Sequence, residues 1–106
     1  MKNSKVLGLL GLAARARNIA FGADSVEMEI KKKKVNLVII AEDASNRTKE
    51  KFEKLCYDYD IPIIIQGTIE YLSKAIGKSN KAIIGIKDSN IANGILKINN
   101  GGDVIG

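Results

Sequence analysis

Two adjacent carboxylates, Glu42 and Asp43, follow directly after the apolar run at 35–41. Paired carboxylates can serve as the general acid and general base of an active site. The sequence contains no histidine and a single cysteine, which excludes Ser-His-Asp triads, Cys-His pairs and histidine-based metal sites. We therefore expect no catalytic residue, no metal site and no cofactor. We expect Asp43, with Ser45 and Asn46, to cap a helix and to present polar groups to a partner.

The densest positive charge is the lysine run at 31–34, which ends a helix expected over 23–34. At 100° per residue, Ala23, Val26 and Ile30 share the inward side of this helix. The opposite side carries Asp24, Ser25, Met28, Lys31 and Lys32. This side begins at Gly22, where the free N–H groups of a helix N-terminus suit a nucleic-acid backbone or base edge. Lysines here can also be solvated and complement the helix dipole, but the shared phase favours phosphate contact.

A second basic segment is GKSNK at 77–81. Its GKS is similar to the end of a phosphate-binding P-loop, but the upstream glycine spacing and the preceding strand are absent. We expect Lys78, Ser79 and Asn80 to contact RNA instead. The formal net charge of +5 and the pI of about 9.4 predict a polyanionic partner, nucleic acid ahead of an acidic membrane surface.

Apolar runs rich in β-branched residues predict the strands that position these groups. Short runs of this kind are typical of strands buried on both faces, as in a mostly parallel sheet. The runs span 35–41, 61–66 and 81–86, and IAF at 19–21 is a weaker fourth strand. Pro62 stands at the start of its run, where a missing N–H is tolerated.

Helical patterns fill the gaps between these strands, at 23–34, 45–59, 68–77 and 88–97. Asp24 and Glu27 have the spacing of a capping box, and Thr68 and Gly77 can begin and end the third of these helices. Cys56 falls on the apolar stripe of the helix at 45–59, so we expect a buried core thiol. The order predicts a three-layer α/β/α sandwich with a central mixed sheet of about four strands. We expect one domain over 1–98 and a flexible tail over 99–106.

The stretch GLLGLAARARN (8–18) admits three interpretations: a secretory signal with an A-x-A site, a core helix, or part of an RNA-binding surface through its two arginines. Arg15 and Arg17 crowd the cleavage point, whereas Leu9, Leu10 and Ala13 form a core stripe with Val6. We therefore predict a helix whose small residues permit close packing on the sheet. No apolar run approaches the roughly 20 residues of a membrane span. Of the two arginines, we expect Arg17, the nearer to Gly22, to touch RNA.

Three segments together resemble the kink-turn RNA-binding ribosomal proteins of the L-seven-Ae type, and in particular their small bacterial YlxQ-like branch. These segments are GLAARARNIAFGADSVEMEI, VNLVIIAEDASNRTKEKFEKLC and IPIIIQGTIEYLSKAIGKSNKAIIGI, and the resemblance covers about residues 5–96. It implies the α/β/α fold, no catalytic activity, no cofactor, and binding to sharply bent RNA built on tandem sheared G·A pairs.

The resemblance also implies which residues contact RNA. The family's motif is a glycine, then Asn-Glu, then a lysine, and these positions carry Gly22, Asp24 with Ser25, and Met28 in this sequence. Lys31 and Lys32, one turn beyond Met28, can supply positive charge in its place. The family's other contacts fall on Glu42, Asp43 and Ala44 and on Lys78, Ser79 and Asn80.

Our leading hypothesis is a non-catalytic, cytoplasmic RNA-binding protein, ribosomal-protein-like, that acts as a monomer on structured, kink-turn-type RNA, in the ribosome or elsewhere. It predicts no membrane and no small-molecule substrate. The alternative is a protein-interaction module of the same fold in which specific RNA recognition is weakened or lost. A third hypothesis is a relative of the substrate-binding domain that precedes SpoU-type RNA methyltransferases, with the chemistry on another chain.

Overall fold

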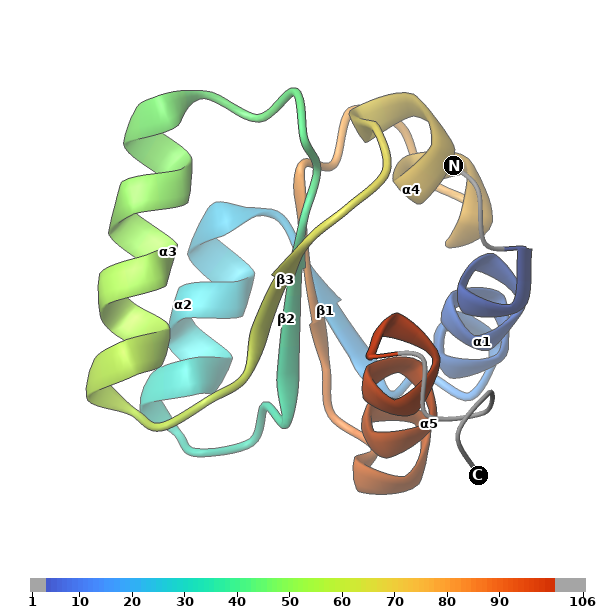
Figure 1. Cartoon of the computed structure of the whole chain (residues 1–106), viewed down its shortest axis with the longest axis horizontal. Coiled ribbons are helices and arrows are strands. Elements are labelled where there is room, and N and C mark those ends of the chain that lie inside the picture. The colour runs from blue at the N-terminus through green and yellow to red at the C-terminus, as the bar shows by residue number, and fades with distance from the viewer. Residues whose placement is uncertain (1–3, 101–106) are drawn as a thin grey trace.

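The computed structural model describes residues 4–100, which form five helices and four strands in alternation. The first half of the chain contains α1 (Ser4–Arg15), β1 (Ile19–Phe21), α2 (Ala23–Lys31) and β2 (Leu37–Ile40). The second half contains α3 (Asn46–Asp58), β3 (Ile63–Ile65), α4 (Ile69–Ala75), β4 (Ile83–Ile86) and α5 (Ser89–Asn99). Figure 1 shows these elements arranged as one α/β domain. The predicted order of helices and strands is confirmed.

The four strands form one mixed sheet in the order β1-β4-β2-β3. Only β2 and β3 are parallel, since β4 runs antiparallel to both β1 and β2. The prediction of a mixed sheet of four strands is therefore confirmed, and the expectation of mostly parallel strands is wrong. Long apolar runs reflect burial on both faces, and helices can bury both faces whichever way the strands run.

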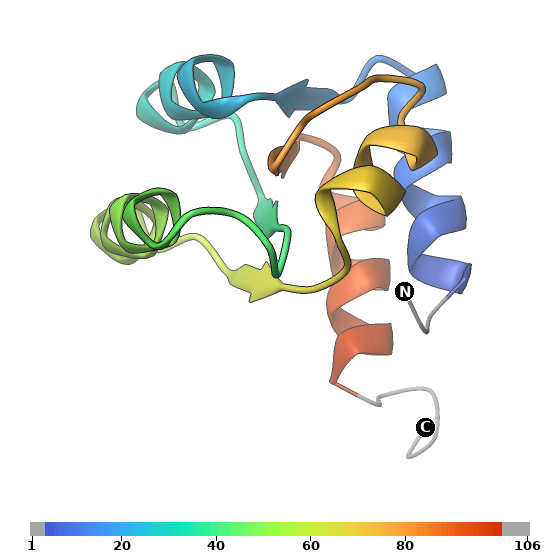
Figure 2. The ribbon, with the colours of Figure 1, turned by 90° about the horizontal axis from the view of Figure 1, so that it is seen from above.

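Helices cover both faces of the sheet, which confirms the three-layer sandwich. The α2 and α3 helices lie on one face, and α1, α4 and α5 lie on the other (Figures 1 and 2). Alternate residues of β2 enter the two cores: Leu37 and Ile39 pack with α1, α4 and α5, while Val38 and Ile40 pack with α2 and α3. All four are fully buried. This alternation follows from the two-residue period of a strand.

The α2 helix differs from its prediction at both ends. It ends at Lys31 rather than continuing to 34, and Lys33 has a φ of 61°, outside helical geometry. At its start Gly22 is the N-cap and makes no side-chain cap, so the capping box of Asp24 and Glu27 does not form. Ala23, expected to face inward, is exposed.

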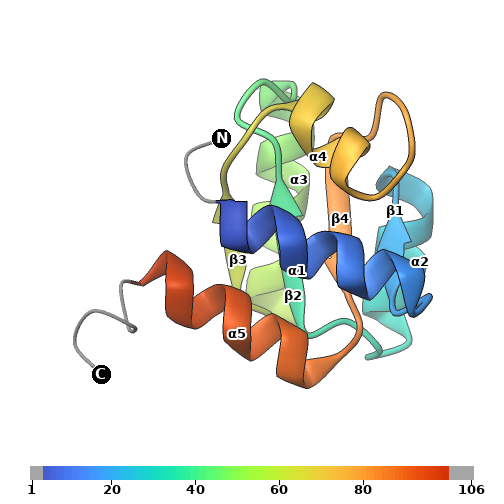
Figure 3. The same ribbon diagram turned by 90° about the vertical axis from the view of Figure 1, so that its right-hand side faces the viewer.

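The stretch 8–18 forms most of α1 and the turn after it, which confirms the helix interpretation. Leu10 and Ala13 are fully buried, as the predicted stripe requires. A Cβ added at Gly11 would lie 3.3 Å from the Ala75 carbonyl oxygen, so this glycine permits close packing on α4 rather than on the sheet. Figure 3 shows α1 and α5 side by side across that face.

The remaining helices begin at the caps that the sequence offers. Ser45 caps α3, Thr68 caps α4 and Asp88 caps α5, each accepting a hydrogen bond from a backbone N–H three residues on. The α5 helix continues to Asn99, two residues past its predicted end, with Asn100 as its C-cap. The rest of the predicted tail, 101–106, lies outside the described residues. In residues 4–100, no helix is long and apolar enough to cross a membrane.

Candidate nucleic-acid interface

Three of the predicted contact segments meet at one end of the sheet. The Gly22 N–H donates to the Ile83 carbonyl at 3.0 Å, which joins the start of α2 to the segment that enters β4. The Ala41 N–H donates to the Ala82 carbonyl at 2.9 Å, which joins the end of β2 to the same segment. In Figure 1 this is the upper end of the sheet, where α2 and α3 begin. We call the surface formed by 22–28, 42–46 and 77–81 the upper edge.

Gly22 has the backbone geometry that sets the start of α2. Its φ of 85° lies in the region that favours glycine, and its ψ is 154°. The first intrahelical bond runs from the Val26 N–H to the Gly22 carbonyl, so the N–H groups of 23–25 have no partner within the helix. These N–H groups and the positive end of the helix dipole can receive an anionic or carbonyl group.

The outer side of α2 has the composition expected from its phase. Asp24, Met28, Lys31 and Lys32 are exposed, and Met28 retains 51% of its accessible surface. An open hollow of about 400 Å³ is lined by these four residues and Glu27. Ser25, the remaining predicted contact of α2, is only half-buried.

Both lysines on this side are paired with glutamates of the same helix. Lys31 lies 2.9 Å from Glu27, and Lys32 lies 3.6 Å from Glu29. Glu27 also binds Lys51 of α3 at 2.8 Å. Hydrogen bonds from Lys51 and Lys31 lower the pKa of Glu27, and the bond to Glu27 raises the pKa of Lys31. These two lysines therefore contribute less free positive charge than the sequence suggests.

The connection after β2 is held by bonds within the protein. The Asp43 carboxylate accepts from the Ile69 N–H at 2.8 Å, so Asp43 stabilises the start of α4. Ser45 caps α3 by accepting from the Thr48 N–H at 3.1 Å, so of the residues expected to cap this helix it is Ser45 that does so. Glu42 is exposed, whereas Ala44 is only 7% exposed and its side chain lies in the core under α3. A partner would meet the backbone of Ala44 rather than its methyl group.

The connection before β4 presents three exposed residues, Lys78, Ser79 and Asn80. They line an open hollow of about 590 Å³ together with Asp43, Ile69, Glu70, Ser73 and Lys74. Ser73 is 2% exposed and fixes this connection. Its hydroxyl accepts from the Lys81 N–H at 2.7 Å and donates to the Lys81 carbonyl at 3.2 Å.

Phe21 supports the lysines of the upper edge, although no sequence pattern singles it out. The Lys78 ammonium lies 5.1 Å and the Lys81 ammonium 5.5 Å from the centre of its ring. Both distances are within the range of a cation–π interaction. Phe21 directly precedes Gly22, so two lysines are held beside the start of α2. Nothing in the local sequence relates this ring to lysines more than fifty positions away.

Arg17 does not join the upper edge. It precedes the start of β1, where Ile19 pairs with Ile86, whereas Gly22 follows the end of β1. Its neighbour Asn18 accepts a bond from the Lys87 N–H, which places Arg17 near the start of α5. Arg17 is close to Gly22 in sequence, which suggested contact with the same partner. The three residues of β1 lie between the two and carry the chain from one end of the sheet to the other.

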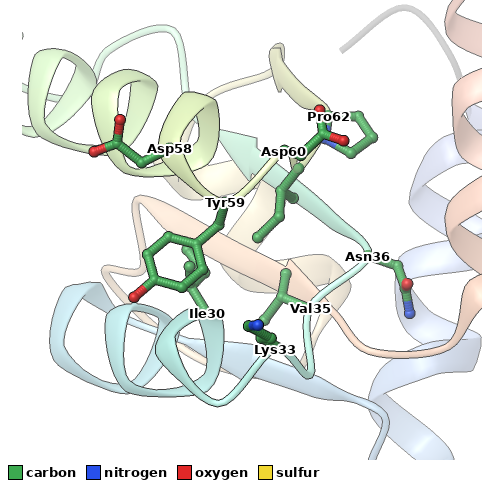
Figure 4. A pocket seen from close by; sticks show the side chains of 9 residues that line it. Ile30, Lys33, Val35, Asn36, Asp58, Tyr59, Asp60 and Pro62 are labelled. Atoms are coloured by element: carbon green, nitrogen blue, oxygen red, sulfur yellow. The ribbon is translucent and has the colours of Figure 1, made fainter.

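A second set of hollows lies at the end of the sheet opposite the upper edge. Figure 4 shows one of about 580 Å³, where the ring of Tyr59 lies over Ile30 and near Lys33 and Val35. Nearby, Cys56 is 1% exposed, and burial raises the pKa of its thiol to about 11. The prediction of an inert core thiol is confirmed. Residues 4–100 contain no group of three or more acidic or cysteine side chains that could hold a metal ion.

The model of the ribosomal protein L7Ae/L30e/S12e/Gadd45 family matches residues 4–94 of this chain. The chain belongs to this family. Two relatives of this chain are named RNA-binding protein YlxQ. The protein from Bacillus subtilis (strain 168) is 34% identical over 90 residues, which cover 85% of this chain and 90% of the relative. The protein from Enterococcus faecium is 32% identical over 88 residues, which cover 83% of this chain and 84% of the relative.

Solved structures agree with this assignment. A protein of unknown function from Bacillus halodurans C has a TM-score of 0.87 and 38% identity, covering 91% of this chain and 97% of that one. The Giardia lamblia 15.5kD RNA binding protein has a TM-score of 0.77 over 92% of this chain and 90% of that one, and at 23% identity it shows the shared fold alone. The L7Ae-family and YlxQ-like resemblance is confirmed, and with it the expectation that the protein is not an enzyme.

Proposed function

We propose that this protein binds structured RNA of the kink-turn type through its upper edge, in the cytoplasm and without catalysis. The observation that carries the proposal is the meeting of three segments at one end of the sheet. These are the glycine-led start of α2, the exposed connection after β2 and the basic connection before β4. The names of the two YlxQ relatives, both called RNA-binding proteins, support it.

Two of these segments have a distinct part in this proposal. The free N–H groups after Gly22 approach the bent RNA backbone, and Asp24 accepts from a guanine amino group. Lys78 and Lys81, held beside Phe21, supply the phosphate contacts that the family's motif assigns to a lysine where this chain has Met28. The charge that binds RNA is thereby shifted from the outer side of α2 toward the connection before β4.

A gel-shift titration tests the proposal directly. The intact protein is titrated against a kink-turn RNA and against a duplex of equal length in which Watson–Crick pairs replace the tandem G·A pairs. We expect tighter binding to the kink-turn RNA. Lys78→Ala should weaken this binding, whereas Lys97→Ala, a matched change on α5 away from the upper edge, should leave it nearly unchanged. Equal binding to both RNAs would reject the kink-turn specificity and leave only a basic surface.

One observation favours the alternative of a protein-interaction module. Met28 is an exposed apolar side chain in a hollow on the outer side of α2, where the family's motif has a lysine. Methionine adapts well to apolar partner surfaces. Met28→Lys separates the two functions, because it should strengthen RNA binding and weaken binding of a protein partner at this hollow. Weaker RNA binding by Met28→Lys would argue against a phosphate near this position. It would also argue against the charge shift described above.

A further inference from the structure

Within residues 4–100, the strand order leaves β3 at an open edge of the sheet, paired only with β2 (Figure 2). The Pro62 carbonyl and the Gln66 N–H both bond to β2, at 3.0 and 2.9 Å. In a parallel ladder alternate residues of a strand bond to the same neighbour, so Ile64 also faces β2. The N–H and C=O groups of Ile63 and Ile65 therefore point away from the sheet.

This edge is protected by the shortness of β3 and by Pro62 at its start, two features that limit pairing with another chain. The strand itself carries none of the charged side chains that also block many such edges. β3 consists of three isoleucines, and the side chain of Ile65 is 40% exposed. An open edge with apolar side chains is a template for an extended segment of another chain, which gains main-chain hydrogen bonds there.

An open hollow of about 960 Å³ lies beside the start of β3 and gives such a segment side-chain contacts. Ile61, Pro62 and Ile63 supply apolar lining from the strand side. Tyr57 supplies an aromatic ring from α3 and is 85% exposed, the most exposed of the large hydrophobic residues in 4–100. Exposed aromatic groups beside apolar surface are typical of the centres of protein interfaces.

The charge of this hollow is opposite to that of the whole protein. Glu53, Asp58 and Asp60 line it, and no basic residue does. Asp58 is paired with the exposed Lys54 at 3.3 Å, whereas Glu53 and Asp60 make no ion pair within residues 4–100. On a chain with a net charge of +5, this is a local site for lysine or arginine side chains.

We propose that the open edge of β3 docks an extended segment of a partner protein in which β-branched residues alternate with lysine or arginine. The backbone of the segment pairs with Ile63 and Ile65, and its basic side chains reach Glu53 and Asp60. A second copy of this chain fits less well, because edge-to-edge pairing would bring the same carboxylates together. The hollow lies at the opposite end of the sheet from the upper edge, so RNA and this partner can bind together.

NMR titration of the whole protein with short synthetic peptides tests the proposal. The probe alternates valine and lysine, and the control peptide has glutamate in place of lysine. At saturation we expect the probe to slow amide exchange at Ile63 and Ile65 by about tenfold or more. The glutamate peptide should bind roughly tenfold more weakly, and so should a lysine peptide that is N-methylated at alternate amides, because it cannot pair with the edge.

Matched variants separate local contact from general attraction. Glu53→Gln with Asp60→Asn should weaken probe binding by about fivefold, and asparagine tolerates the φ of 59° at position 60. Glu50→Gln with Glu70→Gln makes the same change in net charge at exposed sites outside the hollow and should have little effect. Equal effects of the two pairs, unchanged binding after N-methylation, or protection confined to other elements would overturn the proposal. Dimerisation of the free protein through β3 in sedimentation experiments would also overturn it.

Discussion

Gly22, at the start of the candidate interface, has a backbone conformation that favours glycine. Its φ of 85° strains any residue with a side chain, although nothing lies within 4 Å of an added Cβ. We therefore expect Gly22→Ala to lower the free energy of unfolding by roughly 1–3 kcal/mol through backbone strain alone. Urea denaturation measures this change, and RNA affinity should fall as well because the first turn of α2 moves.

Gly8→Ala is the matched control for this substitution. Gly8 lies within α1, has ordinary helical geometry, and also has nothing within 4 Å of an added Cβ. Alanine there should raise the free energy of unfolding by about 0.5–1 kcal/mol. Equal destabilisation by both substitutions would contradict the conformational argument.

Glu29 is a buried carboxylate of α2, although the helical periodicity did not place it among the inward residues. It lies 2.8 Å from Lys87, next to the end of β4. The hydrogen bond from Lys87 holds the pKa of Glu29 below its ordinary value of 4.5, and burial acts in the opposite direction. Because the folded-state pKa is lowered, this carboxylate stabilises the fold at pH values above 4.5. That contribution is lost as the pH falls through the folded-state pKa.

Glu29→Gln should therefore flatten the pH dependence of stability. We expect the wild-type free energy of unfolding to fall below pH 4.5, and the variant to show a smaller fall in that range. Denaturant titrations from neutral to acidic pH measure both curves. Glu50→Gln, on the exposed side of α3, is the control. Curves of equal slope for Glu29→Gln and the wild type would show that the pair with Lys87 has no role in the acid response.

At the scale of elements, periodic patterns predicted the helices and strands, and tertiary contacts determined what the patterns left open. The phase of α2 correctly placed Met28 and Lys31 on the outer side, because one face of the helix must be buried. The end of that helix was missed because the left-handed turn at Lys33 has no glycine to indicate it. The position of Arg17 was wrong because it depends on the direction in which β1 crosses the sheet.

The bonds that assemble the candidate site also could not be predicted from local sequence. From local sequence, Asp43 is equally suited to cap the helix that follows it. Its carboxylate instead accepts a bond from the start of α4, 26 residues on. The ring of Phe21 gains its lysines only because β1 and β4 are neighbours. The family resemblance indicated which segments form the upper edge. The order of charged and polar residues along the chain predicted the kinds of side chain that this surface carries.

The connection between α4 and β4 depends on one side chain of α4. The buried Ser73 hydroxyl bonds to both backbone groups of Lys81. We expect Ser73→Ala to lower the free energy of unfolding by about 1–3 kcal/mol, because the Lys81 N–H loses its partner. RNA binding should weaken by more than this loss of folded protein explains, since Lys78 loses its fixed position. Ser79→Ala, on the exposed tip of the same connection, should leave stability unchanged, as thermal melts can check.

At the scale of the whole molecule, the two ends of the sheet differ in the groups that they present, and we expect them to suit different kinds of partner. The upper edge combines the N–H groups at the start of α2 and the lysines Lys78 and Lys81 with several carboxylates, whereas the charged residues of the hollow beside β3 are all acidic. Helices on both faces of the sheet leave its two ends and its edges as the places where backbone groups are accessible. We therefore expect RNA and the proposed protein partner to bind without a change in the shape of the fold.

The salt dependence of RNA binding tests where the charge of the molecule acts. Each lysine that neutralises a phosphate contributes about one unit to the slope of log affinity against log salt. Lys78→Ala with Lys81→Ala should therefore reduce the slope by up to about 2. Lys31→Ala with Lys32→Ala should reduce it less, because both ammonium groups are already paired with glutamates. The two double variants remove equal charge, so a general field effect would change both slopes alike. A larger change for Lys31 and Lys32 would mean that their glutamate pairs open in the complex and that the RNA backbone follows α2.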